Sequence, residues 1–543
     1  MENRSVKRAF APTFVGLGLA LFTTTLWAQQ PDNDKPYLGK VKGAVESNMG
    51  FYHADEGQPD LSRFGTNTFL NVGYEYKSLS AGLQYEIFEP PMRGFDADLK
   101  GNALTQYFVQ YSGKKLQVRL GSFYEQYGSG LAFRAYEERT LGANNSLRGI
   151  NVKYTPTEWL SLKAMAGQPR RYITYADALM WGGDASLSLL KLINKESQSD
   201  LSLGASWVSR YNTKEVTEAN GFPIPLEEQD PRLVNLYSLR SDFTSGDFGI
   251  GLEYTKKGAS QSYFPGTGGY LIQDGDALLL TVDYTPGDFG ISGQFRRVER
   301  MDFREDNKRK ESYVVMNYIP ALTKQHKYAL PALYPHATNI GGEIGGEIDL
   351  YYNWHADWLG RYPLKATLNL AHYSSLGLNA IDKAPFLGNG GAPLYTEGSL
   401  ELSKKFSRKV EATVGAYYQI DAHTGTAMKS FSQVADVLWR ISRKVSLRGE
   451  LQHMMTEQAD KKWIYGLFEL GFAPYLSVYG SDMYSYGADT PENYYTIGTA
   501  FSYHGLRLSA NYGRSRAGIQ CVGGICRFVP EYQGFTTTLT YAF

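Results

Sequence analysis

The residues best suited to chemistry are scattered along this chain. Its eight histidines stand at positions 53, 326, 336, 355, 372, 423, 453 and 504, and no pair has the spacing of metal ligands on one strand. A hydrolase on a sheet surface would need a histidine beside a serine, and the candidates for these roles are His372, Ser374 and His453. The glycines mark turns and form no phosphate loop. The sequence therefore predicts no enzyme and no cofactor.

Two cysteines offer a different chemistry near the C-terminus. Cys521 and Cys526 enclose the turn sequence Val-Gly-Gly-Ile. Two thiols at this spacing in an exported chain can close a small disulfide. A metal site would need two further soft ligands, and no other cysteine or histidine lies near. We predict a disulfide that staples a loop and binds no metal.

The densest group of charged residues and glycines lies between positions 123 and 149. It contains Glu125, Arg134, Glu137, Glu138 and Arg139. A loop that folded inward with these residues could line a constriction and set its charge selectivity. A solvated outer loop explains the same composition. The sequence leaves both interpretations open.

The rest of the chain must form the scaffold that positions these groups. Along most of it, apolar and polar residues alternate. In the last segment, 533–543, Phe535, Leu539, Tyr541 and Phe543 share one face and Thr536, Thr538 and Thr540 share the other. Period-two alternation is typical of strands. Because the chain stops on an aromatic residue inside such a strand, we expect the last strand to close a sheet against the first.

Short and long connections alternate between these strands. Short, turn-rich stretches such as 112–115, 245–247 and 442–444 separate long ones such as 89–102, 125–145 and 515–532. Short turns on one side and long loops on the other are the signature of an outer-membrane barrel. We therefore predict an all-β fold, a single large transmembrane antiparallel β-barrel. About 25 strands are visible, and an even number requires one more near 327–334, which favours 26 strands over 24.

The polar faces of the strands would then line the lumen. The charged residues expected there are Arg119, Lys153, Lys163, Lys365, Arg448, Glu450 and Arg507. A barrel this wide encloses water or a plug. Because the first strand is expected to start near residue 37, we expect no separate N-terminal plug, which argues against a TonB-dependent transporter. Any filling must come from the long loops or from another protein.

Composition and the N-terminus indicate the compartment. The chain has 543 residues, 41 Tyr and no net charge, and its mean hydropathy of −0.36 excludes a helical multi-span protein. Arg4, Lys7 and Arg8 precede an apolar stretch that ends near Ala28. We predict a secretory signal peptide at 1–28, a short periplasmic segment at 29–36 and the barrel at 37–543. The expected location is the Gram-negative outer membrane, among its lipid and lipopolysaccharide, and nothing suggests nucleic-acid binding.

Two stretches carry a resemblance to a known family. The run from Tyr124 to Ser146 and the later run from His326 to Leu350 resemble an uncharacterised outer-membrane β-barrel family of Bacteroidota. The resemblance extends over essentially the whole mature chain. It implies a non-enzymatic membrane protein associated with type IX protein secretion, with other secretion-machinery proteins as partners. It implies no catalytic residue.

Three functions follow as hypotheses. The first is a structural or accessory component of protein secretion and outer-membrane biogenesis. The alternative is a porin-like channel for small solutes with a loop constriction. The third is an outer-membrane hydrolase. A channel requires a water-filled lumen, whereas an accessory role tolerates an occluded one.

Overall fold

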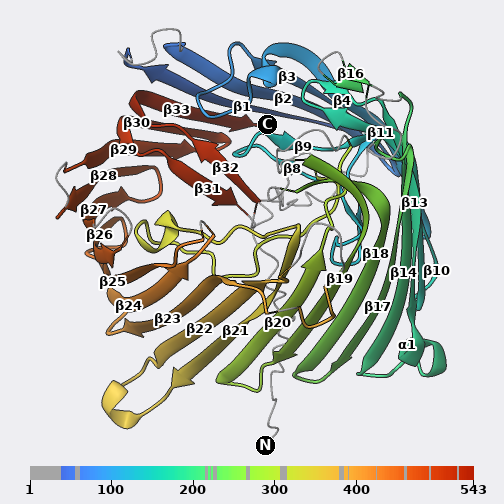
Figure 1. Cartoon of the computed structure of the whole chain (residues 1–543). Coiled ribbons are helices and arrows are strands. Elements are labelled where there is room, and N and C mark those ends of the chain that lie inside the picture. The colour runs from blue at the N-terminus through green and yellow to red at the C-terminus, as the bar shows by residue number, and fades with distance from the viewer. Residues whose placement is uncertain are drawn as a thin grey trace, which may run out of the picture. The chain divides into compact units, whose positions relative to one another are not determined.

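The alternating segments fold as 24 antiparallel strands that close into one barrel (Figure 1). The computed structural model describes residues 38–54, 62–214, 218–219, 222–223, 229–264, 269–305, 315–377, 384–388, 390–423, 425–457, 461–487, 491–522 and 525–543. The predicted signal peptide and the segment 29–36 lie outside these residues. Residues Gly39–Phe543 form one compact unit.

Each barrel strand pairs with its neighbours in the sheet. In chain order, the barrel strands are β1 (Lys40–Tyr52), β2 (Phe64–Tyr76), β3 (Leu79–Phe88), β4 (Gly101–Ser112), β5 (Leu116–Phe123), β10 (Leu147–Thr157), β11 (Leu160–Arg171), β13 (Ala178–Ser188), β14 (Asp200–Asn212), β17 (Leu233–Ser245), β18 (Phe248–Phe264), β19 (Gly269–Tyr284), β20 (Phe289–Glu299), β21 (Gly342–Trp354), β22 (Leu364–Ser375), β23 (Pro393–Lys405), β24 (Val410–Asp421), β25 (Met428–Arg440), β26 (Val445–Thr456), β27 (Lys462–Phe472), β28 (Leu476–Tyr486), β29 (Asn493–Tyr503), β30 (Leu506–Ser515) and β33 (Tyr532–Ala542).

Smaller elements occupy the connections. The short strands are β6 (Gln126–Tyr127), β7 (Phe133–Arg134), β8 (Glu137–Glu138), β9 (Ala143–Asn144), β12 (Thr174–Tyr175), β15 (Glu218–Ala219), β16 (Phe222–Pro223), β31 (Gly518–Val522) and β32 (Ile525–Val529). The helical turns are α1 (Leu189–Ile193) and the 3₁₀ turns Ala97–Leu99, Pro331–Leu333 and Asp357–Leu359. None of the helices in the described residues is long and apolar enough to cross a membrane.

The last strand closes the barrel against the first, as the sequence predicts. β1 and β33 pair antiparallel from Ala44 opposite Ala542 to Tyr52 opposite Gly534. The terminal Phe543 extends this ladder, because its backbone N–H donates to Gly43 O at 2.9 Å and its carbonyl accepts from Gly43 N at 3.0 Å. The chain therefore ends inside the sheet, and this pairing leaves neither β1 nor β33 as an open edge.

The count of 24 corrects the preferred prediction of 26. No strand forms in residues 315–341, the described part of the connection between β20 and β21 that lies beyond 305. The stretch expected to be a strand near 327–334 instead contains the 3₁₀ turn Pro331–Leu333. Pro331 has no N–H to donate to a ladder. This segment runs inside the ring of strands (Figure 1).

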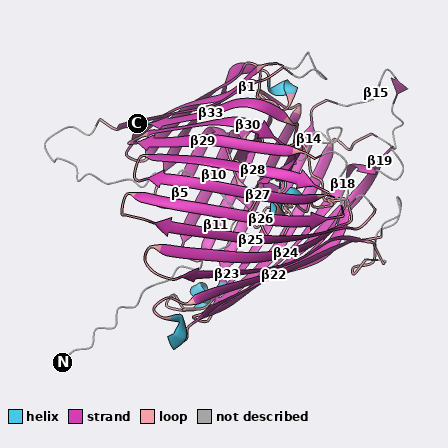
Figure 2. Ribbon diagram, turned by 90° about the vertical axis from the view of Figure 1, so that its left-hand side faces the viewer, coloured by secondary structure: helices cyan, strands magenta, loops and turns pink. Residues whose placement is uncertain are grey.

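Apolar side chains cover the outer face of the strands, while the inner face carries polar side chains except where apolar ones pack against the inner loops. On β17, Tyr237 and Leu239 are 54% and 66% exposed, whereas the inward Ser238 is 1% exposed. Figure 2 shows the strands running side by side along the barrel wall. Exposed aromatic residues gather where strands meet the short turns, as expected at a membrane interface; they include Trp354, Trp358, Phe406, Phe472, Tyr475 and Tyr503.

Connections are sorted by length between the two ends of the barrel. β2 and β3 are joined through residues 77–78, and β17 and β18 through 246–247. At the other end, residues 124–146 join β5 to β10 and residues 300–341 join β20 to β21. We call these the turn end and the loop end of the barrel. In outer-membrane barrels the short turns are periplasmic.

Candidate functional site: the loop-filled end of the lumen

The connection 124–146, here called the first inner loop, turns back into the lumen. It forms the hairpins β6–β7 and β8–β9, and β8 and β9 lie inside the ring of strands (Figure 1). Ser129 N donates to Glu253 Oε2 of the wall at 2.9 Å. A Cβ on Gly128 would lie 2.7 Å from that carboxylate, and Gly128 has a φ of +55°, so glycine suits this approach on both counts. The structure therefore favours the inward interpretation of this loop over the solvated one.

An apolar core joins the first inner loop to the connection 300–341, here called the second inner loop. The residues of this core are almost completely buried and come from both loops and from the wall of β5 to β20; they are Phe123, Tyr127, Leu131, Phe133, Ala135, Leu147, Met165, Met180, Val208, Val234, Leu236, Ala277, Val298, Met301, Phe303, Met316 and Ile319. Burial of apolar surface is the dominant favourable contribution to folding. The loop end is thus packed like a protein interior.

Hydrogen bonds also join the two inner loops directly. Arg134 N donates to Met316 O at 2.9 Å, and Tyr318 N donates to Gly130 O at 2.8 Å. The Arg134 guanidinium lies over the rings of Tyr318 and Tyr136, 3.7 Å and 5.0 Å from their centres. Burial raises the pKa of Tyr136, so its phenol stays neutral. The two loops therefore behave as one inner body.

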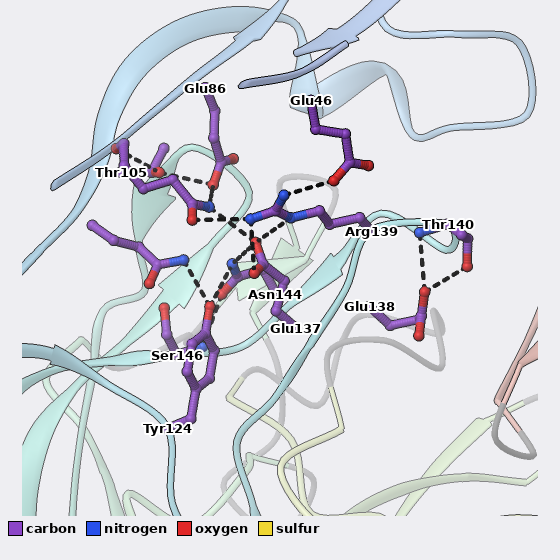
Figure 3. Close-up of polar contacts among 12 residues, drawn as sticks. Glu46, Glu86, Thr105, Tyr124, Glu137, Glu138, Arg139, Thr140, Asn144 and Ser146 are labelled. Atoms are coloured by element: carbon purple, nitrogen blue, oxygen red, sulfur yellow. Dashed lines mark hydrogen bonds and ion pairs between the residues drawn. The ribbon is translucent and has the colours of Figure 1, made fainter. Parts of the chain in front are cut away.

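A polar cluster fixes the first inner loop to the wall of β1 to β4 (Figure 3). Arg139 Nη1 lies 2.8 Å from Glu46 Oε2, and its Nη2 donates to Gln84 Oε1 at 3.2 Å. Glu137 accepts from Gln84 at 2.9 Å and from Asn144 at 3.1 Å. Burial opposes the charge of Arg139, but the carboxylates of Glu137 and Glu46 outweigh it and raise the pKa of Arg139.

A buried ion pair lies beside this cluster. Arg170 and Glu86 are 4% and 1% exposed. The guanidinium of Arg170 binds both oxygens of Glu86, with one contact of 2.8 Å. Thr105 Oγ1 also donates to Glu86 at 2.8 Å. A cavity of about 30 Å³ between Arg170 and Arg139 leaves room for water and little else.

The other predicted constriction residues also lie along the inner loop. Glu125 Oε1 lies 2.8 Å from Lys163 Nζ, and its Oε2 accepts from Asn151 at 2.9 Å. Glu138 accepts from the side chain and the backbone of Thr140. Glu125, Glu137 and Arg139 are therefore engaged by the wall, while Glu138 bonds within its own loop.

The second inner loop crosses the wall from β22 to β29 with alternate side chains. Leu322 packs against Ala371 and Tyr373 of β22, and Leu330 packs against Met454 and Trp463. Between them, Lys324, His326 and Tyr328 contact β23, β24 and β25; their partners are Glu401 for Lys324, Glu397 and Tyr417 for His326, and Tyr417 and Asp436 for Tyr328. We call residues 322–330 the wall segment.

Two histidines hold the end of the second inner loop. His336 is stacked between Tyr373 and Tyr395, with ring centres 4.7 Å and 5.1 Å away. Its Nδ1 lies 3.1 Å from His423 Nε2, and His423 Nδ1 lies 2.7 Å from Asp421. Burial lowers the pKa of His336. Burial also opposes charge on His423, but Asp421 more than compensates and raises the pKa of His423.

The predicted lumen-lining residues fall into two groups. Arg119, Lys163, Arg448 and Glu450 have bonded partners on the inner face: Arg119 donates to Ser122 O at 2.7 Å, and Arg448 lies 3.0 Å from Asp436 and 2.5 Å from Glu450. Lys153 shares their face, directly opposite Lys163. Lys365 and Arg507 are exposed near the turn end.

The remaining candidates have limited chemistry. Cys521 and Cys526 form a disulfide across the β31–β32 hairpin. Ser374 Oγ lies 3.2 Å from His372 Nε2, but the other nitrogen of His372 faces the hydroxyl of Thr396 at 2.8 Å. A hydroxyl gives an imidazolium none of the charge stabilisation that a carboxylate supplies. Among the described residues, no group of three or more His, Cys, Asp or Glu side chains could hold a metal ion.

Sequence reasoning did not identify the ion pair of Glu86 and Arg170, the wall segment or the pair of histidines 336 and 423. The first had a weak signal, because both charges stand at the loop ends of their strands. The strand expected near 327–334 rested on the need for an even strand number, and the structure has a 3₁₀ turn at Pro331–Leu333 there.

Comparison with known proteins places the chain in a family. Residues 12–543 match the model described as Family of unknown function (DUF6029). The chain belongs to this family. Among curated proteins, none matches the sequence.

Several solved barrels resemble the chain. The P pilus usher (PapC) translocation pore has a TM-score of 0.45 and 10% identity, covering 93% of this chain and 99% of that chain. The siderophore receptor PirA from Pseudomonas aeruginosa has a TM-score of 0.42 and 10% identity, with 94% and 81% covered. The copper transporter OprC has a TM-score of 0.41 and 9% identity, covering 93% of this chain and 80% of that chain. At these values the likeness supports no inference about function.

The location follows from the barrel itself. A closed sheet satisfies its backbone hydrogen bonds without water, as a membrane span must. An even number of antiparallel strands, an apolar outer face and sorted turns are the features of bacterial outer-membrane barrels. The protein is therefore an outer-membrane β-barrel.

Proposed function

We propose that this barrel is a structural or accessory component of protein secretion that acts through partner proteins rather than as an open pore. The observation that carries the proposal is the packed loop end, where both inner loops share one apolar core with the wall. An occluded lumen suits an accessory role and disfavours free solute diffusion. The resemblance to a Bacteroidota family associated with type IX secretion supports the same class of partner.

We propose further that the role is not catalytic. The described chemistry of the inner loops is structural, since their charged groups are engaged by ion pairs and hydrogen bonds. The expected surroundings are outer-membrane lipid and lipopolysaccharide, and the expected partners are proteins of the secretion machinery. No cofactor enters this proposal.

A porin-like channel is the second candidate. It is favoured by the turn end of the lumen, where Lys365 and Arg507 are exposed. In this case the first inner loop would be a constriction whose charges select the solute. The two candidates differ in whether the resting barrel conducts ions.

Single-channel recording separates them. The refolded protein is inserted in a planar bilayer, and correct folding is checked by heat-modifiable migration on a gel. We expect no stable conductance from the intact protein. Large, steady conductance steps from the intact protein would contradict an occluded lumen and would favour the porin-like channel.

A genetic experiment then tests the link to secretion. Deletion of the gene should change the set of secreted proteins and leave the uptake of small solutes unchanged. The opposite result, normal secretion with impaired uptake, would contradict the proposed role.

A further inference from the structure

The wall segment meets the wall with alternate side chains, through an irregular stretch that ends in a turn at Ala329 and Leu330. Leu322, Lys324, His326, Tyr328 and Leu330 occupy every second position, and each contacts the wall. Alternate residues of an extended stretch meet the same surface, which suits Lys324 and His326, whereas the bend at Tyr328 and the turn at Ala329 and Leu330 bring Leu330 to the wall. The side chains that meet the wall are, in chain order, the apolar Leu322, the basic Lys324, the titratable His326, the aromatic Tyr328 and the apolar Leu330.

The wall also recognises the backbone of the segment. Tyr373 OH donates to Leu322 O at 2.5 Å. Gln452 Oε1 accepts from Leu330 N at 2.8 Å, and Gln419 Nε2 donates to Pro331 O at 3.0 Å. Contacts to main-chain amides and carbonyls suit a polypeptide rather than a sugar or an ion, because they recur along any extended peptide.

The charges of the wall complement those of the segment. Lys324 Nζ lies 2.6 Å from Glu401, and His326 Nε2 lies 2.6 Å from Glu397. Lys327 adds a contact of 3.4 Å to Glu401. These carboxylates are nearly buried, with side-chain exposures of 14% for Glu401 and 0% for Glu397. Without the segment, Glu401 would lose Lys324 and Lys327, and Glu397 would lose His326.

The wall holds more carboxylates than the segment neutralises. Glu347 and Asp349 of β21 accept hydrogen bonds from the Asn369 amide at 2.6 Å and 2.9 Å. Neither forms an ion pair in the described part of the chain. Glu450 shares Arg448 with Asp436. The inner wall of β21 to β26 thus carries carboxyl groups beyond those that contact the segment.

From this arrangement we propose that the inner wall of β22 to β27 binds an extended, basic and aromatic segment of a partner or exported polypeptide, and that residues 322–330 occupy this site when the polypeptide is absent. The inference rests on the proposed role in protein secretion and specifies the chemistry of the partner. Exchange of the two segments would release part of the inner body from the wall without breaking the barrel.

A peptide-binding experiment tests the inference. In the full-length protein, residues 322–330 are replaced by a Gly-Ser segment of equal length, which vacates the wall. The probe is a fluorescent peptide with the sequence of residues 321–332, Ala-Leu-Thr-Lys-Gln-His-Lys-Tyr-Ala-Leu-Pro-Ala. Its anisotropy is measured with the protein in nanodiscs. We expect saturable binding to the replaced variant and binding at least about tenfold weaker to the intact protein, whose site is filled.

Two further substitutions locate the site. In the replaced variant, Glu397→Gln with Glu401→Gln should weaken peptide binding by about tenfold or more, as expected for charge-assisted contacts. The matched control is Glu411→Gln, an inward carboxylate of β24 near the turn end that pairs with Lys405 and Arg440. It should leave binding unchanged.

Three results of this experiment would overturn the inference. A folded replaced variant that fails to bind the peptide, or that binds it equally well after the two wall substitutions, overturns the inference. The inference is also overturned if a peptide whose basic residues are replaced by glutamate binds the replaced variant as tightly as the original peptide does. These results leave the proposed function standing, because that proposal is tested by conductance and secretion of the intact protein.

Discussion

The two ends of the lumen share the same strands but differ in packing. On β17, the inward Val234, Leu236 and Ser238 at the loop end are at most 1% exposed. On the same face near the turn end, Asp242 and Thr244 are exposed. The wall is continuous, so the difference comes from the inner loops, which cover one end only. The packing of the lumen at the loop end is therefore a property of the inner loops.

The sharpest test of this contrast compares two cysteines on one strand. Thr244→Cys should react rapidly with a water-soluble maleimide, while Ser238→Cys should react about 10³-fold more slowly, because it must await a local opening of the packed end. Labelling rates of the folded protein measure this ratio. Similar rates at both positions would mean that the inner loops do not pack against β17.

The next effect concerns ion pairs at the two ends. Glu86→Gln leaves Arg170 buried without its charged partner and should cost about 3–5 kcal/mol. The matched change at the turn end is Glu75→Gln, whose partner Lys42 is 35% exposed in its side chain. This change should cost about 1 kcal/mol or less. Urea unfolding in lipid measures both. Equal losses of unfolding free energy in the two variants would contradict the difference in packing between the loop end and the turn end.

A smaller effect is expected from one apolar contact of the wall segment. Leu330 is 0% exposed, and Leu330→Ala should cost about 2–4 kcal/mol of local stability. Leu438→Ala, at a half-buried inward position near the turn end of β25, should cost less. Hydrogen exchange of the amides in 318–333 reports the local opening. Unchanged protection after Leu330→Ala would show that this contact does not hold the segment.

The smallest effect depends on pH. The raised pKa of His423 means that its protonated form stabilises the fold. This contribution is complete below the unfolded value of about 6.5 and is lost as the pH rises through the folded pKa. His423→Gln should therefore reduce stability at pH 5 to 6, by about 1 kcal/mol or less, with no loss well above the folded pKa.

The measurement is the difference in urea midpoint between His423→Gln and the wild type across pH. His336 acts in the opposite sense, because its lowered pKa favours the neutral form, and its contribution is lost as the pH falls. A loss that grew with rising pH in His423→Gln would contradict the assignment.

The sequence predicted the barrel and its closure because period-two alternation records which face of each strand meets lipid. Phe535, Leu539 and Tyr541 carry that signal directly. It did not decide the direction of the first inner loop, since Glu125, Arg134 and Arg139 suit water as well as a wall. The sequence also did not decide between 26 and 24 strands. A count of about 25 required an even number, which either value satisfies, and the stretch 327–334 forms a 3₁₀ turn at Pro331–Leu333 instead of the extra strand.

The order of the contacting residues along the chain has a consequence for the assembly of the barrel. The first inner loop binds Glu46 and Gln84, which precede it in the chain, whereas the wall segment binds β22 to β29, which follow it. Its contacts with Gln452 and Trp463 span more than 120 residues. Contacts of long sequence separation form late. Residues 322–330 can therefore complete their contacts only after the C-terminal third of the sheet has formed, whereas Met301, Met316 and Ile319 of the same loop pack against strands that precede them.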